Sequence, residues 1–451
     1  MKPAPLHWDL RNPHYISWLH FLKETEGWSI TQIQEYQIQE IQRIVHYAYQ
    51  NTRKYRELYD QWNICPEDLK DLKDFQKLPF VEKEMIRDDL EGFSVKIPGR
   101  IYVTTGGSTG IPLGFYRDRI SFARELASKA HQYYRVGWKE GDRQMVLRGI
   151  PINTPSHIRY DPRFNELRCS SYFLTPESMD GYIAKAREFQ PQWIRCYPSS
   201  GFLLARYLKE TGKSFPPVKG ILCASENLYD FQKSLMRNVF GARVFSHYGH
   251  YEMAVLAGFC EYEDTYHVLP QYGFAELIDQ NGAQVTRPGE IGEIVATSFI
   301  MQATPFIRYK TRDLAVLKSW GCPSCGRPYQ VWERIEGRSH EFILTGKGRL
   351  ISMTAINMHD DIFDSIKQFQ FFQERRGEVI FRFIPKDHFQ DRDREKIKAG
   401  LLHKLGDDVQ LTLESTEEIH PTARGKRSFL VQKLNLGIPA SPSLTPRSGQ
   451  M

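Results

Sequence analysis

The chain has 451 residues, of which 41% are hydrophobic and 25% charged, and its formal net charge is +6. This length allows a large domain together with a small one, and the composition is typical of a globular protein. The mild, evenly mixed charge argues against nucleic-acid partners. Met1–Leu19 lacks the pattern of a signal peptide, and no apolar run is long enough for membrane insertion. The seven scattered cysteines form no disulfide framework, so we expect a cytoplasmic protein.

The first predicted elements are helices near the N-terminus. Ser29 and Gln32 have the spacing of a capping box, which marks the start of a helix. The apolar residues that follow at helical spacing are Ile33, Ile41, Ile44, Val45 and Ala48. Residues 77–93 predict a loop that leads into another helix. We expect both helices to be structural.

A turn rich in glycine and hydroxyl groups follows in YVTTGGSTGIPLGFY (102–116). Because glycine has no Cβ, backbone N–H groups can close round an anion there, and the hydroxyls add further donors. The turn predicts a phosphate-binding loop, with an ordinary loop as the alternative; it is not the Walker pattern, because no G-K-[ST] follows. The predicted phosphate contacts are Thr104, Thr105, Gly106, Gly107, Ser108, Thr109 and Gly110.

Between residues 100 and 335, short apolar runs alternate with helical stretches. This alternation predicts layered α/β structure, and IGEIVATSF (291–299) and PFIRYK (305–310) are predicted to be late strands.

After Arg338 the pattern changes to that of a compact α+β unit. Glu378–Pro385 predicts a strand, Asp393–Leu405 a helix, and residues 409–414 alternate like a half-buried strand. The predicted division is a large α/β N-terminal domain over residues 1–337, a small mobile α+β C-terminal domain over 338–436, and a Pro/Ser-rich disordered tail over 437–451.

Six short motifs follow one another in a fixed order: the turn at 102–116, ILCASENL (221–228), FSHYGHYE (245–252), PFIRYKTRDLAVL (305–317), IEGRSHEFI (335–343) and HPTARGKRSFLV (420–431). This order resembles that of the adenylate-forming enzymes, the acyl-CoA synthetase superfamily. The likeness covers nearly the whole chain and is greatest to the branch of phenylacetate–CoA ligase and the CapK-type proteins. It implies the adenylate-forming fold and a ligase that requires ATP and Mg²⁺.

The resemblance also implies roles for the nucleotide-binding residues. Ser225 and Glu226 match the adenine-pocket segment, although a polar pair after a strand is also an ordinary turn. Tyr248 would stack on adenine, Gly249 would follow it, and Glu252 would hold Mg²⁺ between the phosphates. Here Tyr251 replaces the usual threonine.

Asp313 matches the carboxylate that binds both ribose hydroxyls, and Tyr309 would pack beside it. Arg312 stands where the family has glycine. Arg338, at the domain junction, would approach the ribose or a phosphate. Without the resemblance Asp313 would be an unremarkable surface carboxylate.

Lys426 is the residue expected to enter the site from the small domain and place its ammonium at the reacting oxygens. With Glu252 and Thr105 it completes the predicted catalytic set. The domain would then rotate about a hinge near Arg338–His340 to admit the second substrate. The family's usual lysine after the phosphate loop is Ile111 here, so that cation is missing or supplied elsewhere.

A zinc site is also predicted. Cys322 and Cys325 form a C-x-x-C knuckle, and members of this branch have a Cys…His segment upstream, here Cys260 and His267. The resemblance therefore implies a Cys₃His structural zinc site, against the alternatives of a redox pair or ordinary thiols.

The predicted function is activation of a small-molecule carboxylic acid as acyl-AMP and transfer of the acyl group to CoA or an amine. The CapK likeness favours a role in cell-surface polysaccharide biosynthesis, and a homodimer is one assembly that the sequence allows. Three alternatives stay open: nucleotidyl transfer to a cofactor, a non-catalytic nucleotide-binding relative, and a zinc-knuckle nucleic-acid binder, which the charge pattern disfavours.

Overall fold

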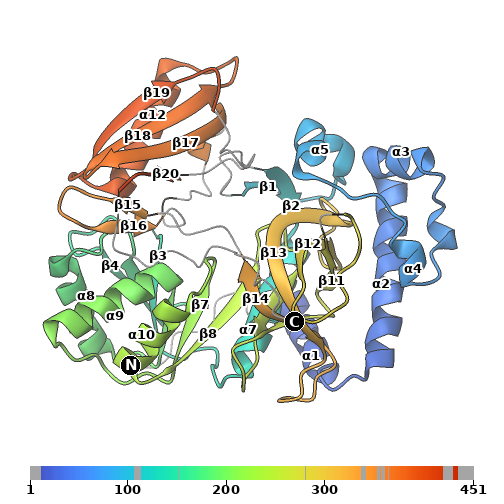
Figure 1. The fold of residues 1–451 in the computed structure, drawn as a ribbon, viewed down its shortest axis with the longest axis horizontal. Coiled ribbons are helices and arrows are strands. Elements are labelled where there is room, and N and C mark those ends of the chain that lie inside the picture. Colours follow the sequence, from blue (N-terminus) through green and yellow to red (C-terminus); the bar gives the residue numbers. More distant parts are fainter. Residues whose placement is uncertain are drawn as a thin grey trace, which may run out of the picture.

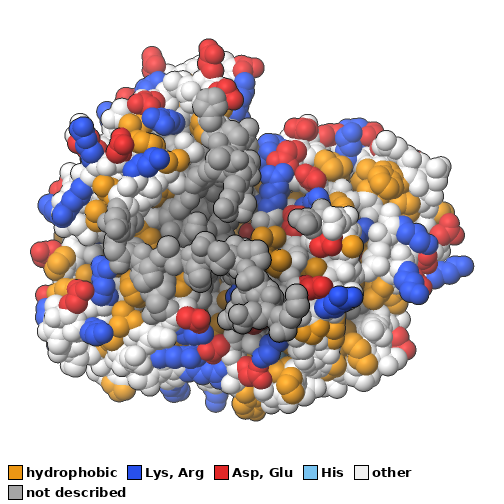
Figure 2. All heavy atoms as spheres, in the orientation of Figure 1, with side chains coloured by type: hydrophobic (Ala, Val, Ile, Leu, Met, Phe, Trp, Pro, Cys, Tyr) orange, Lys and Arg blue, Asp and Glu red, His pale blue; other side chains and the backbone are white. Residues whose placement is uncertain are grey.

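The computed structural model describes residues 12–105, 113–150, 152–279, 281–336, 342–352, 356, 361–363, 365–419 and 430–434. Figure 1 shows a broad α/β body with a smaller orange unit, the C-terminal residues, beside one end of it. Basic and acidic side chains are interspersed over the face seen in Figure 2. None of the helices in the described ranges has both the length and the apolarity needed to cross a bilayer.

The N-terminal elements are α1 (Pro13–Glu24), α2 (Ile30–Asn51), α3 (Arg53–Gln61), η2 (Pro66–Asp68), α4 (Leu72–Phe75), α5 (Lys83–Asp88) and α6 (Leu90–Phe93). The predicted capping box is confirmed at α2. The Ser29 hydroxyl accepts a hydrogen bond from the Gln32 backbone at 3.3 Å, and the Gln32 side chain accepts one from the Ser29 backbone at 3.0 Å. The apolar positions predicted for this helix are all buried. Residues 77–93 form two short helices instead of the single helix predicted.

A twelve-stranded sheet forms the body of the molecule. Its strands are β3 (Gln144–Arg148), β4 (Ile158–Asp161), β5 (Glu166–Ser170), β6 (Trp193–Cys196), β7 (Gly220–Ala224), β8 (Arg243–Gly249), β9 (Leu256–Phe259), β10 (Tyr266–Val268), β11 (Gly273–Ile278), β12 (Ile291–Ser298), β13 (Tyr309–Trp320) and β14 (Gln330–Glu336). They lie in the order β11-β12-β13-β14-β10-β9-β8-β7-β6-β3-β5-β4. Strands β5, β3, β6, β7 and β8 are parallel neighbours, and the other pairs are antiparallel.

Helices cover both faces of the parallel strands. On one face, α8 (Pro176–Phe189), α9 (Pro198–Thr211) and α10 (Asp230–Phe240) share a core with β3, β6 and β7. On the other face, α7 (Arg119–Tyr134) packs against Trp193 and Leu222. Double coverage explains why every residue of β7 is buried and why this strand reads as a continuous apolar run. The predicted α/β class is confirmed.

The late strands differ in part from the prediction. IGEIVATSF corresponds to β12, but β13 begins only at Tyr309, so most of PFIRYK precedes the strand. The reason is Arg308, whose φ of 44° bends the backbone. Its guanidinium donates to the buried Glu276 carboxylate at 2.9 and 3.0 Å, which holds the bend in place. Before the sheet, the hairpin β1 (Ile101–Thr104) and β2 (Gly114–Arg117) brackets the predicted phosphate loop.

The C-terminal unit consists of β15 (Phe342–Leu344), β16 (Leu350–Ser352), η3 (Asp361–Phe363), β17 (Ile366–Arg375), β18 (Glu378–Pro385), α12 (Asp391–Leu405), β19 (Gln410–Ser415) and β20 (Leu430–Gln432). Strands β19-β18-β17-β20 form its sheet. Phenylalanines from β17 and β18 pack with Ile397, Leu401 and Leu405 of α12 in a separate core. The predicted α+β class of this unit is confirmed, whereas the proposed domain limits stay a prediction.

Candidate active site

The candidate site begins where two neighbouring parallel strands end. Ser225 and Glu226 follow β7 directly, and Tyr248 and Gly249 close β8, the next strand in the sheet. In α/β sheets ligands bind outside the carboxyl ends of the parallel strands, because backbone dipoles and loops converge there. Ser225 has a φ of 71°, a conformation that costs free energy in a non-glycine residue and is commonest at functional sites.

Glu252 lies just beyond β8 and is 3% exposed. The Tyr309 hydroxyl donates to one carboxylate oxygen at 2.7 Å, and His250 Nδ1 lies 3.1 Å from the other. Lys83 Nζ, from α5, lies 3.7 Å from the same carboxylate. Burial alone would raise the pKa of Glu252, but Lys83, His250 and the Tyr309 hydrogen bond outweigh it and hold the pKa below its usual range. A buried ionised carboxylate of this kind can bind a cation such as Mg²⁺.

Lys83 was not found from the sequence. It belongs to the 77–93 segment, where only a structural helix was predicted, and a single lysine in a charged helix carries no signal of its own. Its proximity to Glu252 arises because α5 packs beside β13, the strand that carries Tyr309.

Tyr248 and Asp313 meet across the sheet. The Tyr248 hydroxyl donates to Asp313 Oδ2 at 2.9 Å, which joins the end of β8 to β13. Burial and the charge of Asp313 raise the pKa of Tyr248 well above its ordinary value, so this hydroxyl stays protonated and serves as a donor. The predicted adenine and ribose residues are therefore brought together, from motifs far apart in the chain.

Arg312, at the family's glycine position, keeps the backbone conformation that glycine favours. Its φ is 67°. The Arg312 backbone N–H donates to Glu293 at 3.0 Å, and its guanidinium forms an ion pair with Glu84. These two contacts stabilise a conformation that is otherwise unfavourable for arginine.

Glu226 has a partner that the sequence did not indicate. Its carboxylate accepts hydrogen bonds from the backbone N–H and the hydroxyl of Ser199, both at 2.9 Å. Ser199 lies in the first turn of α9, where N–H groups need acceptors and an anion is favourable. Glu226 thus connects β7 to α9, and no contact identifies an adenine-binding role.

Thr104 and Thr105 stand at the base of the predicted phosphate loop. Thr104 pairs with Gly114 in the hairpin, and Thr105 exchanges hydrogen bonds with Leu113 at 2.8 and 3.0 Å. The other predicted site residues lie outside the described residues, as does Ile111; they are Gly106, Gly107, Ser108, Thr109, Gly110, Arg338 and Lys426.

Arg117, at the far end of the hairpin, lies over the rings of Phe122 and Tyr251.

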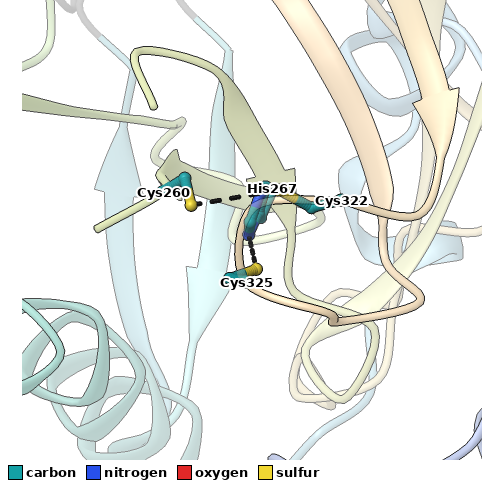
Figure 3. A group of neighbouring side chains, drawn as sticks. All are labelled: Cys260, His267, Cys322 and Cys325. Atoms are coloured by element: carbon teal, nitrogen blue, oxygen red, sulfur yellow. Dashed lines mark hydrogen bonds between the residues drawn. The ribbon is translucent and has the colours of Figure 1, made fainter. Parts of the chain in front are cut away.

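The four predicted zinc ligands lie together (Figure 3). Cys260 follows β9, His267 lies on β10, and Cys322 and Cys325 come from the loop between β13 and β14. Their ligand atoms lie within 4.8 Å of one another. Cys260 Sγ lies 4.0 Å from Cys322 Sγ, and Cys325 Sγ lies 3.9 Å from His267 Nδ1.

This geometry fits a tetrahedral metal. Zn–S bonds of about 2.3 Å place two thiolates roughly 3.8 Å apart, whereas a disulfide needs about 2.05 Å. Burial raises the pKa of Cys260 to about 12 and lowers the pKa of His267 to about 4. The imidazole is therefore neutral, as a ligand must be, and a cation at this position would favour the thiolates.

Comparisons with known proteins place these features in a family context. Residues 343–433 match the family described as CapK C-terminal domain. The chain is 24% identical over 437 residues to the protein CapK of Staphylococcus aureus, covering 93% of both chains. It is 25% identical over 334 residues to the phenylacetate-coenzyme A ligase of Pseudomonas putida, covering 72% of this chain and 74% of the relative.

A solved 2-hydroxyisobutyryl-CoA ligase, in complex with 2-HIB-AMP and CoA, has a similar fold. Its TM-score is 0.59 at 18% identity, with 91% of each chain covered. The resemblance drawn from the six motifs is therefore confirmed: the chain is a homologue of CapK and of the phenylacetate–CoA ligases and has the adenylate-forming fold.

Proposed function

We propose that this chain is an ATP- and Mg²⁺-dependent ligase that activates a carboxylic acid as acyl-AMP and passes the acyl group to CoA. The observation that carries this proposal is a pair of carboxylates, Glu252 just beyond β8 and Asp313 on β13. Glu252 is buried and ionised, and Asp313 is fixed by the Tyr248 hydroxyl. The homology to phenylacetate–CoA ligases supports the same chemistry.

In the first half-reaction a carboxylate oxygen of the acid attacks the α-phosphorus of ATP, and pyrophosphate leaves with the electron pair of the broken P–O bond. Both reactants are anionic, so the site must align them and stabilise the charge that develops on the phosphate. We assign Mg²⁺ binding to Glu252, ribose binding to Asp313, and phosphate binding to the loop that starts at Thr104. Lys426 supplies the mobile cation.

In the second half-reaction the acceptor attacks the acyl carbon and AMP leaves. We favour CoA as the acceptor because four of the curated relatives are CoA ligases, and an amine is the alternative. The hinge near Arg338–His340 would let the small domain change its orientation between the two steps. The CapK homology supports the further proposal of a role in cell-surface polysaccharide biosynthesis.

A pyrophosphate-release screen tests this proposal. Aromatic, fatty, amino and sugar acids are each supplied with ATP and Mg²⁺, with and without CoA. We expect at least one acid class to release pyrophosphate and, with CoA, to give free AMP and a thioester. ATP binding without pyrophosphate release for any acid would favour the non-catalytic relative, and an AMP-modified product would favour nucleotidyl transfer to a cofactor.

We also propose that Cys260, His267, Cys322 and Cys325 bind one structural zinc ion. The distances and the neutral histidine support this assignment. All four protein ligands would be used, which leaves no open position for catalysis.

A further inference from the structure

Arg148 lies at the edge of the sheet where the candidate active site is built, and it has no ion-pair partner in the part of the chain that the structure describes. Arg148 is the last residue of β3, and its side chain is half-buried. β3 is parallel to β6, β7 and β8, so Arg148 lies at the same carboxyl edge as Ser225 and Tyr248. Its guanidinium lies over the Tyr197 ring, 5.5 Å from the centroid.

Two nearby cations on this face of the sheet have carboxylate partners. Lys129 of α7 forms an ion pair with Glu125, and Arg195 of β6 lies 3.2 Å from Glu166. Among the described residues, no carboxylate lies within ion-pair distance of Arg148, and its buried Nε makes no hydrogen bond. Glu226, on a neighbouring strand end, accepts its hydrogen bonds from Ser199.

The charged and titratable groups described around Arg148 include two cations, a histidine and Glu226, whose charge also acts on Tyr197. His247 of β8 faces the same region, and the Tyr133 hydroxyl lies 3.0 Å from its Nδ1. Burial and the charges of Lys129, Arg148 and Arg195 push the pKa of His247 well below its ordinary value, so this ring is neutral. Arg148 therefore has no ion-pair partner in the described chain, although the charge of Glu226 acts on the same Tyr197 ring.

Arg148 does not lie beside the residues proposed to bind the nucleotide. β3 and β8 are three strand spacings apart, which is about 14 Å at roughly 4.8 Å per spacing. A group bound by Arg148 thus lies well to the side of Glu252 and Asp313, which come from β8 and β13 and their ends. The acid substrate is the reactant that could extend into this region while its reacting carboxylate stays at the phosphates.

Resting on the proposed ligase function, we propose that Arg148 binds a second anionic group on the acid, so that the preferred substrates are dicarboxylic acids or carboxylic acids with another oxyanion. A planar guanidinium that already stacks on Tyr197 presents its remaining N–H groups in the fork that matches a carboxylate.

Matched acids test the proposal with the full chain. Hexanoate is compared with adipate, and benzoate with terephthalate, by pyrophosphate release. We expect kcat/KM at least about tenfold higher for the dianion of each pair, because hydrogen bonds to charged groups are the strong ones. Para-sulfobenzoate is the third arm: a preference for it over terephthalate supports the anion site and identifies a sulfonate-like group instead of a carboxylate.

Substitutions test whether the preference for dianionic acids depends on Arg148. Arg148→Met is expected to raise KM for the dianions about tenfold or more, with KM for the monoanions and for ATP changed less than about twofold. Arg148→Lys should restore part of the preference. Arg159→Met is the control, because Arg159 is exposed on β4 at the edge of the same sheet. Melting temperatures of the variants check the fold.

Equal use of monoanions and dianions by the wild type would overturn the proposal, and so would an Arg148→Met effect confined to ATP. If no acid releases pyrophosphate, the ligase function has failed, and calorimetric titration then decides the anion site by itself. Adipate binding that is lost in Arg148→Met supports the site, and no difference between adipate and hexanoate refutes it.

Discussion

At the scale of single residues, Glu252, the proposed Mg²⁺ ligand, keeps its charge although it is buried. We expect Glu252→Gln to lower the rate of adenylation on the order of 100-fold or more, since the amide keeps the shape but cannot hold Mg²⁺ at the phosphates. Pyrophosphate release over a range of Mg²⁺ concentrations measures this. Glu188→Gln is the control, because Glu188 is an exposed carboxylate of α8 that pairs with Lys185. An unchanged rate with unchanged Mg²⁺ dependence in Glu252→Gln would contradict the assignment.

Lys426 gives a second prediction at this scale. Lys426→Ala should reduce acyl-AMP formation on the order of 100-fold or more while ATP affinity changes little, because the ammonium acts on the transition state. Arg427→Ala removes the neighbouring charge of the same basic turn and should have little effect. Stopped-flow pyrophosphate release and ATP titration separate the two quantities. Near-normal adenylation in Lys426→Ala would refute its role.

At the scale of elements, the cysteine cluster joins β9 and β10 to the loop that connects β13 with β14. We expect about one zinc ion per chain, and Cys325→Ser should release it and lower the melting temperature by about 3–10 °C. Cys65→Ser is the control because Cys65 is an exposed thiol that does not belong to the cluster. Metal analysis and thermal unfolding provide the measurements. A metal-free wild type of full stability would rule the site out.

A buried carboxylate in the β4–β5 hairpin should make the stability of the fold depend on pH. Asp161 is almost fully buried; its hydrogen bonds with Arg163, together with the charge of Arg168, hold the pKa of Asp161 at about 2. Since the folded pKa lies below the unfolded value of about 4, the stabilisation is present above pH 4 and is lost as the pH falls towards 2. Asp161→Asn should therefore lower stability by about 2 kcal/mol at pH 7, and the difference should shrink between pH 4 and pH 2.

Asp387→Asn is the matched control for that experiment. Asp387 also pairs with a cation, Lys367 at 3.0 Å, but both side chains are exposed, and such pairs contribute little. Denaturant unfolding at several pH values compares the two variants. A constant difference between wild type and Asp161→Asn from pH 7 to pH 2 would exclude this carboxylate as the source.

Local patterns made several elements predictable from the sequence, and long-range contacts limited the rest. The capping box, the strand at Glu378–Pro385 and the alternation of β19 are encoded within a few residues, so they were predicted correctly. The bend before β13 was missed because it depends on Arg308 reaching Glu276 on another strand. In the site, family motifs identified Glu252 and Asp313, but the partners Lys83 and Ser199 belong to distant segments without a motif.

At the scale of the whole molecule, the C-terminal unit rests on one end of the large sheet (Figure 1). Arg349, almost fully buried, donates to the backbone carbonyl of Tyr172 in the large body and pairs with Asp408 at 2.9 Å within the small unit. Tyr172 also joins the apolar core of that unit. Tyr172 follows β5 by two residues and its hydroxyl donates to the carbonyl of Gly149, so the small unit contacts the sheet edge that carries Arg148.

The last prediction concerns the proposed rotation of the small C-terminal domain between the two half-reactions. The hinge can be tested without knowing the domain orientation in either half-reaction. His340→Pro fixes φ near −65° and restricts the residue before it, so rotation at this position should be hindered. We expect acyl-AMP formation to stay within about twofold of the wild type and thioester formation to fall at least about tenfold. His340→Ala removes the imidazole but leaves the backbone free, and it should leave both steps nearly intact. Single-turnover measurements of pyrophosphate release and of acyl-CoA formation resolve the two steps. Equal losses in both, or none in either, would show that rotation at this position does not separate the half-reactions.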